Sequence, residues 1–286
     1  MPSLGRRGFT LAELLVALAL FGIVAEGIYR VLVASQRISH AQTQRIDLQQ
    51  TLRGAASLLP VEFRELDATD GDIHAMAATA ITIRAMRQLA FVCRPAALDG
   101  RGAGLTLTIR AAALYGLRDF NPVTDSLLIY YESEVAAPDG DGWALAGLTG
   151  VANDTCPDGA LGRKLGARLA PSPEQPNRTA TVPVGAPVRG FEPVTYWLYP
   201  ASDGKWYLGM RSGVGTQPLA GPLSPAGLSF AYYDATGAST AVPTRVALIE
   251  IRVRGLSAEP VRGLGGGLDH AEDSVVTWVA LRNNRR

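Results

Sequence analysis

Few residues of this 286-residue sequence have the types and spacing that catalysis or metal binding requires. The three histidines, His40, His74 and His270, are far apart and lack a ligand spacing such as H-E-x-x-H. The sequence contains no G-x-S-x-G nucleophile motif, no P-loop and no Rossmann glycine pattern. It therefore predicts neither an enzyme nor a cofactor or metal site.

Two aspartates have the alternating spacing that begins a calcium-binding loop. Asp139 and Asp141 alternate with Gly140 and Gly142. The later ligands of an EF-hand are missing, including its bidentate glutamate. We therefore interpret this segment as a tight hairpin turn before Trp143, with no metal bound.

Cys93 and Cys156 are the only two cysteines in the sequence. An even count permits one disulfide if this part of the chain is exported to an oxidising compartment. The bond would close a loop of about 60 residues, which the chain-entropy treatment values at on the order of 4 kcal/mol. Two free buried thiols are the alternative.

Glu13 is the titratable residue in the most unusual setting, because it interrupts a long apolar segment. Apart from Glu13, residues 9–25 carry no charge, and after Glu26 and Gly27 the apolar character resumes as far as Val33, broken only by Arg30. At about 1.5 Å per residue, a helix over residues 9–33 spans the hydrocarbon core of a bilayer. The basic residues Arg6 and Arg7 precede it and predict a cytoplasmic N-terminus. An ionisable group in such a segment is costly and usually has a function.

The N-terminus combines a short basic leader, Gly8, the sequence from Phe9 to Glu13, and a long apolar helix. This combination resembles the class III signal of type IV pilins and type II secretion pseudopilins. The resemblance implies that prepilin peptidase cleaves between Gly8 and Phe9 and that the new N-terminus at Phe9 is methylated. It also implies a single-pass protein of the bacterial inner membrane, with a cytoplasmic N-terminus and a periplasmic head, which then joins a filament of pilin or pseudopilin subunits.

The same resemblance suggests an assembly role for Glu13. In a filament the apolar helices bundle in the centre, and the Glu13 carboxylate can face the Phe9 ammonium of a neighbouring subunit. An unpaired charge in such a low-dielectric setting costs several kcal/mol, so this pairing selects the axial register.

Beyond Val33 the apolar spacing predicts an amphipathic helix as far as Leu59. One stripe of this helix, expected to pack on the protein's own sheet, contains Ile38, Ala41, Leu48, Leu52, Ala55 and Leu59. Pro60 is expected to end or kink the helix, and residues 61–66 can add a last turn.

From about residue 79 a period-two alternation predicts β-strands. The predicted strands are 80–84, 89–93, 105–110, 126–131, 194–199, 206–210, 228–233, 245–253 and 274–281. Residues 200–205 predict a hairpin turn, residues 234–237 predict another, and the Gly/Pro-rich stretch 140–193 is interpreted as a surface loop region. The expected fold is α+β and pilin-like, with a long N-terminal helix packed on an antiparallel sheet. Its parts are a leader (1–8), a transmembrane and assembly helix (9–36) and a periplasmic or extracellular head (37–286).

The net charge of +1 argues against capture of nucleic acid by overall charge. The one noticeable basic cluster is Arg252 and Arg254, on one face of a predicted strand, with Arg282, Arg285 and Arg286 in the tail. A solvated strand face is the preferred interpretation, and a nucleic-acid partner is not favoured.

The order of strands in the C-terminal half is similar to that of W-type minor pilins and J-type minor pseudopilins. This similarity implies a structural, non-enzymatic minor subunit that initiates or caps a type IV pilus-like filament. Two alternatives stay open, a minor pseudopilin of a type II secretion system and an adhesin or DNA receptor displayed on a filament.

Overall fold

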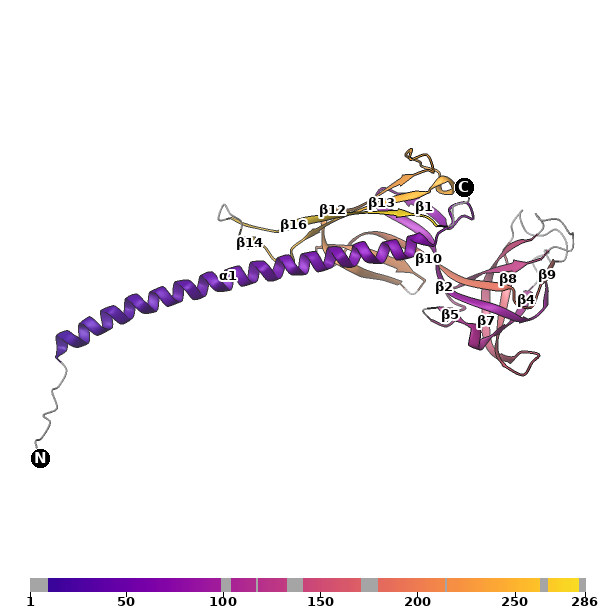
Figure 1. The fold of residues 1–286 in the computed structure, drawn as a ribbon, viewed down its shortest axis with the longest axis horizontal. Coiled ribbons are helices and arrows are strands. Elements are labelled where there is room, and N and C mark those ends of the chain that lie inside the picture. Colours follow the sequence, from indigo (N-terminus) through magenta and orange to yellow (C-terminus); the bar gives the residue numbers. More distant parts are fainter. Residues whose placement is uncertain are drawn as a thin grey trace, which may run out of the picture.

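The structure is a computed structural model that describes residues 10–98, 104–116, 118–132, 141–170, 180–213, 215–262 and 267–282. One long N-terminal helix is followed by a mostly antiparallel β-sheet, which confirms the predicted α+β class (Figure 1). The helix is α1 (Leu11–Arg64), and the strands are β1 (Ile73–Ala77), β2 (Ala80–Arg94), β3 (Ala96–Leu98), β4 (Gly104–Arg110), β5 (Tyr115–Gly116), β6 (Ser126–Tyr131), β7 (Gly142–Thr155), β8 (Leu161–Leu169), β9 (Ala180–Val182), β10 (Pro187–Pro200), β11 (Trp206–Ser212), β12 (Gly215–Tyr233), β13 (Leu248–Leu256), β14 (Val261–Arg262), β15 (Leu268–Asp269) and β16 (Glu272–Ala280).

The C-terminal part of α1 packs on the sheet, and its N-terminal part does not. Of the predicted apolar stripe, the residues from Leu48 onward are buried, while Ile38 is 59% exposed. The helix does not end at Pro60 but continues through a last turn to Arg64. Phe63, which is fully buried, holds this turn in place through edge-on contact with the ring of Tyr196 at 5.8 Å. Packing of the apolar stripe thus outweighs the main-chain hydrogen bond that a proline cannot make.

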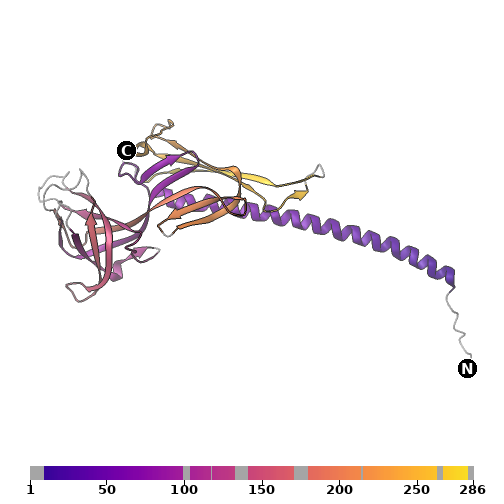
Figure 2. The same ribbon diagram turned by 180° about the vertical axis from the view of Figure 1, so that it is seen from behind.

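Two long strands, β2 and β10, pair antiparallel from Trp197 opposite Ala80 to Pro187 opposite Phe91 and run through both lobes of the molecule. The helix lobe has a core of α1, the first half of β2, the second half of β10, and β11, β12, β13 and β16. The distal lobe has its own core, from the other halves of β2 and β10 with β4, β6, β7 and β8. Opposite views place the distal lobe beyond the C-terminal end of α1 (Figures 1 and 2).

The interpretation of residues 140–193 as a loop region was wrong. This stretch contains β7, β8, β9 and the first half of β10, which supply much of the distal-lobe sheet. Their buried positions include small residues such as Ala144, Ala146 and Ala167. Since alanine and glycine contribute little hydropathy, the period-two pattern of these strands is weak in the sequence and becomes strong only when neighbouring strands cover them.

Most other predicted strands are present, with changes at their ends. The predicted strand 126–131 coincides with β6, and the predicted hairpin joins β10 to β11. The predicted strands 80–84 and 89–93 are parts of the single strand β2. The register of β2 against β10 shifts there, because Gly190 lies opposite Gln88 while Phe191 lies opposite Met86. Arg87 is therefore the extra residue of a β-bulge, which explains why the alternation of the sequence breaks at this point.

Candidate functional site

The N-terminal turn of α1 positions the carboxylate of Glu13. Thr10 is the N-cap, and its hydroxyl accepts a hydrogen bond from the Glu13 main-chain nitrogen at 3.3 Å. In return, Glu13 Oε2 accepts from the Thr10 main-chain nitrogen at 2.9 Å and from its hydroxyl at 3.0 Å. This is a complete capping box. Within the described residues Glu13 Oε1 receives no hydrogen bond, so the carboxylate can accept one more donor while it caps its own helix.

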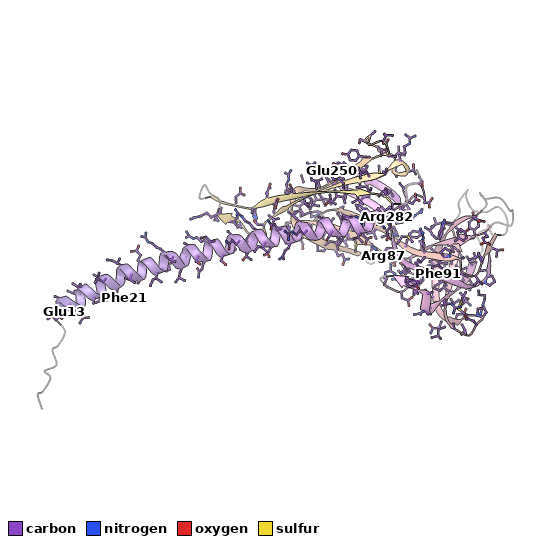
Figure 3. The ribbon with its side chains drawn as sticks, in the orientation of Figure 1. Glu13, Phe21, Arg87, Phe91, Glu250 and Arg282 are labelled. Carbon is purple, nitrogen blue, oxygen red and sulfur yellow. A yellow bond between two sulfur atoms is a disulfide. The ribbon has the colours of Figure 1, made fainter. Side chains whose placement is uncertain are left out.

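The first half of α1 presents apolar side chains to the exterior. Phe21 and Val31, for example, are 71% and 70% exposed, and Figure 3 shows Glu13 and Phe21 on the projecting part of the helix. By length and composition α1 is able to span a membrane. Its one internal ion pair joins Arg30 Nε to Glu26 Oε1 at 3.0 Å, one helical turn apart. The i,i+4 spacing of these residues could have revealed this pairing from the sequence.

Gly8 and Phe9, the residues of the expected cleavage, lie outside the described residues. The structure therefore leaves the processing and assembly residues as predictions, while it places Glu13 at the exposed tip of the described helix.

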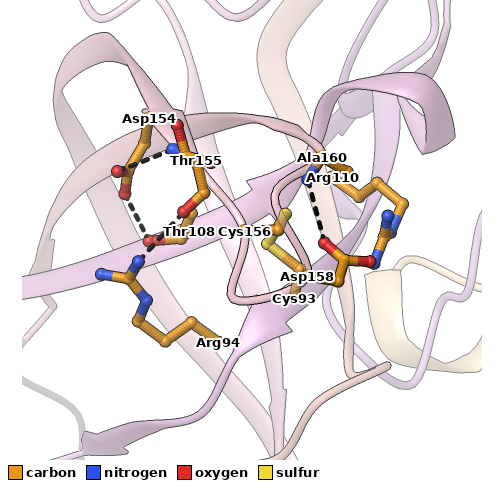
Figure 4. The surroundings of a disulfide bond; sticks show 9 residues. All are labelled: Cys93, Arg94, Thr108, Arg110, Asp154, Thr155, Cys156, Asp158 and Ala160. Carbon is orange, nitrogen blue, oxygen red and sulfur yellow. Dashed lines mark hydrogen bonds and ion pairs between the residues drawn. A yellow bond between two sulfur atoms is a disulfide. The ribbon is translucent and has the colours of Figure 1, made fainter.

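The expected disulfide is present between Cys93, near the end of β2, and Cys156, just after β7 (Figure 4). The two Cα atoms are 5.7 Å apart, and both side chains are buried. Hydrogen bonds support the strands on either side, including Arg94 Nη2 to the Thr155 carbonyl at 3.0 Å and Thr108 Oγ1 to Asp154 Oδ2 at 2.8 Å. The bond therefore joins β2 to the turn between β7 and β8 within the distal lobe.

A partly buried ionic cluster lies where the two lobes meet. The bulge in β2 directs Arg87 toward the end of α1, where its Nη1 lies 3.0 Å from Glu62 Oε1. Its Nε lies 2.8 Å from Glu192 Oε1 of β10. Arg118 contacts Glu192 Oε2 at 3.6 Å and holds Asp125 through two hydrogen bonds, at 2.7 and 2.5 Å. We call Glu62, Arg87, Arg118, Asp125 and Glu192 the junction cluster, since it connects α1, both long strands and the distal lobe.

The electrostatics of the junction cluster favour the charged forms of Arg87 and Asp125. Burial opposes the charge of Arg87, but the hydrogen bond to Glu192 and the charge of Glu62 outweigh this effect and raise the pKa of Arg87. Burial likewise tends to raise the pKa of Asp125, but hydrogen bonds from Arg118 and from the Asn121 main chain hold it below its usual value. Sequence reasoning missed this cluster: the gap between the predicted strands 80–84 and 89–93 is the local trace of the bulge, and it does not identify the partners of Arg87.

The other candidate residues are not brought together. His40 lies 3.4 Å from Glu259, and the ring of His270 contacts the Ser257 carbonyl. The described part of the chain contains no group of three or more His, Cys, Asp or Glu residues able to hold a metal ion. Asp141 receives a hydrogen bond from the Tyr130 hydroxyl at 3.2 Å, whereas Asp139 and Gly140 lie outside the described residues.

The predicted basic cluster is divided between two places. Arg252 and Arg254 are exposed on β13, as expected for a solvated strand face, and Arg252 is paired with Glu250 at 3.1 Å. Arg282 lies at the end of α1, where its main-chain nitrogen donates to the Arg64 carbonyl at 3.0 Å. Arg285 and Arg286 lie outside the described residues.

Comparison with known proteins assigns the N-terminal segment. Residues 4–25 match a family model described as the prokaryotic N-terminal methylation motif. No curated protein and no solved structure matches the chain. The match indicates a substrate of the type IV pilin or pseudopilin kind, with a class III signal, processing by prepilin peptidase and partners among pilin-type subunits. Together with the exposed apolar helix, it indicates membrane anchoring.

Proposed function

We propose that the chain is a minor type IV pilin or pilin-like subunit that initiates or caps a pilus-like filament. The observation that carries the proposal is the tip of α1. An apolar helix that the head leaves uncovered begins with a capping-box glutamate, within a segment that matches the methylation motif. Both apolar surface and an available carboxylate oxygen are what a helix needs to join a bundle of identical helices.

The proposed division of the chain follows from the same features. Residues 1–8 are the leader, residues 9–36 are the transmembrane and assembly helix, and residues 37–286 are the head. In support, the first buried side chain of α1 is that of Gln44. The uncovered part before it is roughly 50 Å long at about 1.5 Å per residue, which exceeds the hydrocarbon thickness of a bilayer.

Cleavage between Gly8 and Phe9 would create a positively charged N-terminus directly before the N-cap Thr10. Glu13 Oε2 is already bonded to Thr10, so Oε1 is the atom available to the Phe9 ammonium of a neighbouring subunit. Partners at this end are therefore other pilin or pseudopilin subunits, and the enzyme that prepares it is prepilin peptidase.

The position of the distal lobe supports a place at the end of a filament. It lies beyond the C-terminal end of α1, along the direction of the helix (Figure 1). In a shaft whose helices are bundled along its axis, a lobe at that position would occupy the space of the subunit above. A terminal subunit has no such neighbour. The same chemistry and shape serve a minor pseudopilin of type II secretion, which differs in its partner filament.

Two substitutions in the capping box, one at Glu13 and one at Thr10, test the assembly role of Glu13. Glu13→Gln retains a side-chain oxygen for the capping box and removes the charge, whereas Thr10→Ala removes the cap hydroxyl and retains the charge. We expect Glu13→Gln to remain in the membrane and to be depleted from sheared filaments, and Thr10→Ala to be incorporated. The measurement is the ratio of filament to membrane subunit by quantitative immunoblotting. Incorporation of Glu13→Gln at the wild-type ratio would show that the charge has no role.

Intact-mass analysis of the protein from its native membrane tests the processing step. The expected mass begins at methylated Phe9. An intact Met1, or a start elsewhere, contradicts the proposed function. Immunogold labelling of the head then tests the position, with label expected at filament ends and a uniform distribution along the shaft counting against a cap or initiator.

A further inference from the structure

A cleft of about 600 Å³ lies beside the junction cluster, between the end of α1 and the distal lobe. Its walls come from four parts of the fold, namely α1, β2, β5 and β10, together with Arg282 after β16. Figure 3 shows Arg87 and Arg282 at this junction. The volume is that of a typical ligand site, and such sites often lie between lobes or domains. Of the residues that line the cleft, Arg87 and Glu62 belong to the junction cluster, and the others have no role assigned so far.

One wall of the cleft contains a short gap in the strand pairing of β2, at Met86. β10 pairs with one edge of β2, and the opposite edge carries β1 as far as Ile83 and β5 from Gln88 onward. Between them the Arg84 main-chain nitrogen donates to the Asp72 carbonyl. Strand alternation turns the main-chain groups of Ala85 toward β10 and those of Met86 toward this edge, where no strand of the described chain pairs with Met86. An extended peptide can add to such an edge through main-chain hydrogen bonds.

The cleft also holds cations that have no carboxylate of their own. Arg189 and Arg282 are exposed, and neither lies within 4 Å of a carboxylate in the described part of the chain. The Arg189 guanidinium is held 4.7 Å over the ring of Trp143, which limits its freedom. Arg84 Nε, which belongs to a third lining residue, is buried without a hydrogen-bond partner. Buried polar groups are normally satisfied, so this donor indicates a missing acceptor.

The remaining lining residues favour an acidic peptide over a nucleic acid as the bound anion. Glu62 and Glu65 stand among the arginines, so the dense negative charge of a nucleic acid would be repelled as well as attracted. Val61, Met86 and Leu89 add apolar surface. In an extended peptide, successive side chains point to opposite sides, so apolar and acidic residues can face different walls.

We propose that this cleft binds an extended acidic peptide segment of a partner protein, whose main chain pairs with Met86 of β2 and whose carboxylates contact Arg189 and Arg282. The site is at the end of α1 opposite to Glu13, so it does not depend on membrane insertion or filament assembly. It gives the head a recognition function that the assembly helix lacks.

Fluorescence anisotropy with the full-length protein in detergent micelles tests this site. The probe is a short fluorescein-labelled peptide of alternating glutamate and valine. Arg189→Gln and Arg282→Gln each remove one charged donor and are expected to raise the Kd about tenfold, as the loss of a charge-assisted hydrogen bond does. Arg254→Gln, which removes an exposed arginine of β13, is the matched control and should leave the Kd unchanged. An equal effect of all three substitutions would show that binding is only long-range attraction.

Changes in the peptide separate the two parts of the proposal without altering the protein. A glutamine-for-glutamate peptide tests the carboxylates, and an alternately N-methylated peptide of the original sequence tests the strand edge. Both are expected to bind at least about tenfold more weakly, because each loses its own set of hydrogen bonds. Unchanged binding of the N-methylated peptide overturns strand addition. Binding of a single-stranded oligonucleotide that depends on Arg189 and Arg282, with no binding of the glutamate peptide, overturns the assignment to a peptide.

Discussion

Replacement of Arg87 by methionine removes the central cation of the junction cluster and leaves its carboxylates behind. The arginine side chain is 8% exposed and makes hydrogen bonds of 2.8 Å to Glu192 and of 3.0 and 3.1 Å to Glu62. Breaking a buried pair from one side typically costs about 3–5 kcal/mol because the remaining charge is uncompensated. Arg118 still lies 3.6 Å from Glu192, so we expect a loss near the lower end, about 3 kcal/mol.

A second substitution separates the charge from the packing. Adding Glu192→Gln to Arg87→Met removes one of the two carboxylates that lose the Arg87 guanidinium, the other being Glu62. The double variant should therefore regain about 1–2 kcal/mol relative to Arg87→Met alone, which is the range for an unsatisfied buried polar group. The matched control is Arg110→Met, because Arg110 and its partner Asp158 are 38% and 53% exposed. An exposed pair of this kind contributes about 0–1 kcal/mol.

Urea denaturation of the full-length protein in a mild detergent provides the assay, with near-ultraviolet circular dichroism reporting tertiary packing. The free energy of unfolding is compared for the four proteins at neutral pH. If Arg87→Met costs no more than Arg110→Met, the junction cluster does not stabilise the connection between the lobes. A double variant less stable than Arg87→Met would likewise refute the reasoning, since the uncompensated charge would then not be the cause.

Three further predictions concern the head and its contact with α1. Because the pKa of Asp125 is lowered in the folded protein, its ionised form stabilises the fold above the ordinary pKa of 3.8, and this contribution is lost as the pH falls through the lowered value. Asp125→Asn should therefore flatten the acid side of a profile of melting temperature against pH, and an unchanged profile would contradict this. Joint replacement of Cys93 and Cys156 by serine should cost about 4 kcal/mol for a sequence separation of 63 residues, measured by urea denaturation, whereas an unchanged midpoint would exclude a stabilising disulfide. Leu52→Ala should cost about 2–5 kcal/mol in the same measurement because the side chain is 4% exposed, and Leu18→Ala, at a position 61% exposed, should not alter the packing of the head.

Features that depend on neighbouring residues along the chain were predictable from the sequence. The N-terminal segment is one, because an apolar run, its preceding basic residues and Glu13 lie within a few helical turns. The stripe from Leu48 to Leu59 is another, because a period of 3.6 places these residues on one face of a helix before any sheet is present. With only two cysteines, the sequence also limited the disulfide to one pairing.

The strands of the distal lobe were predicted less well. β7 and β8 depend on small residues that are buried only when the sheet has formed, and their own hydropathy does not distinguish them from a loop. Arg245 was included in a strand, but it ends a short 3-10 turn, and β13 begins at Leu248. In both cases the tertiary environment overrode a weak local pattern.

By itself, therefore, the sequence determined the apolar helix, its acidic tip and the stripe that attaches it to the head, since each arises from local periodicity. Only the tertiary structure decided that the head has two lobes and that the junction cluster lies between them. Arg87 and Glu192 are 105 positions apart in the chain, and they meet because β2 pairs with β10 and a single extra residue turns the arginine toward both carboxylates. No local pattern encodes a strand pairing over that separation, so neither the junction cluster nor the cleft beside it could be read from the sequence.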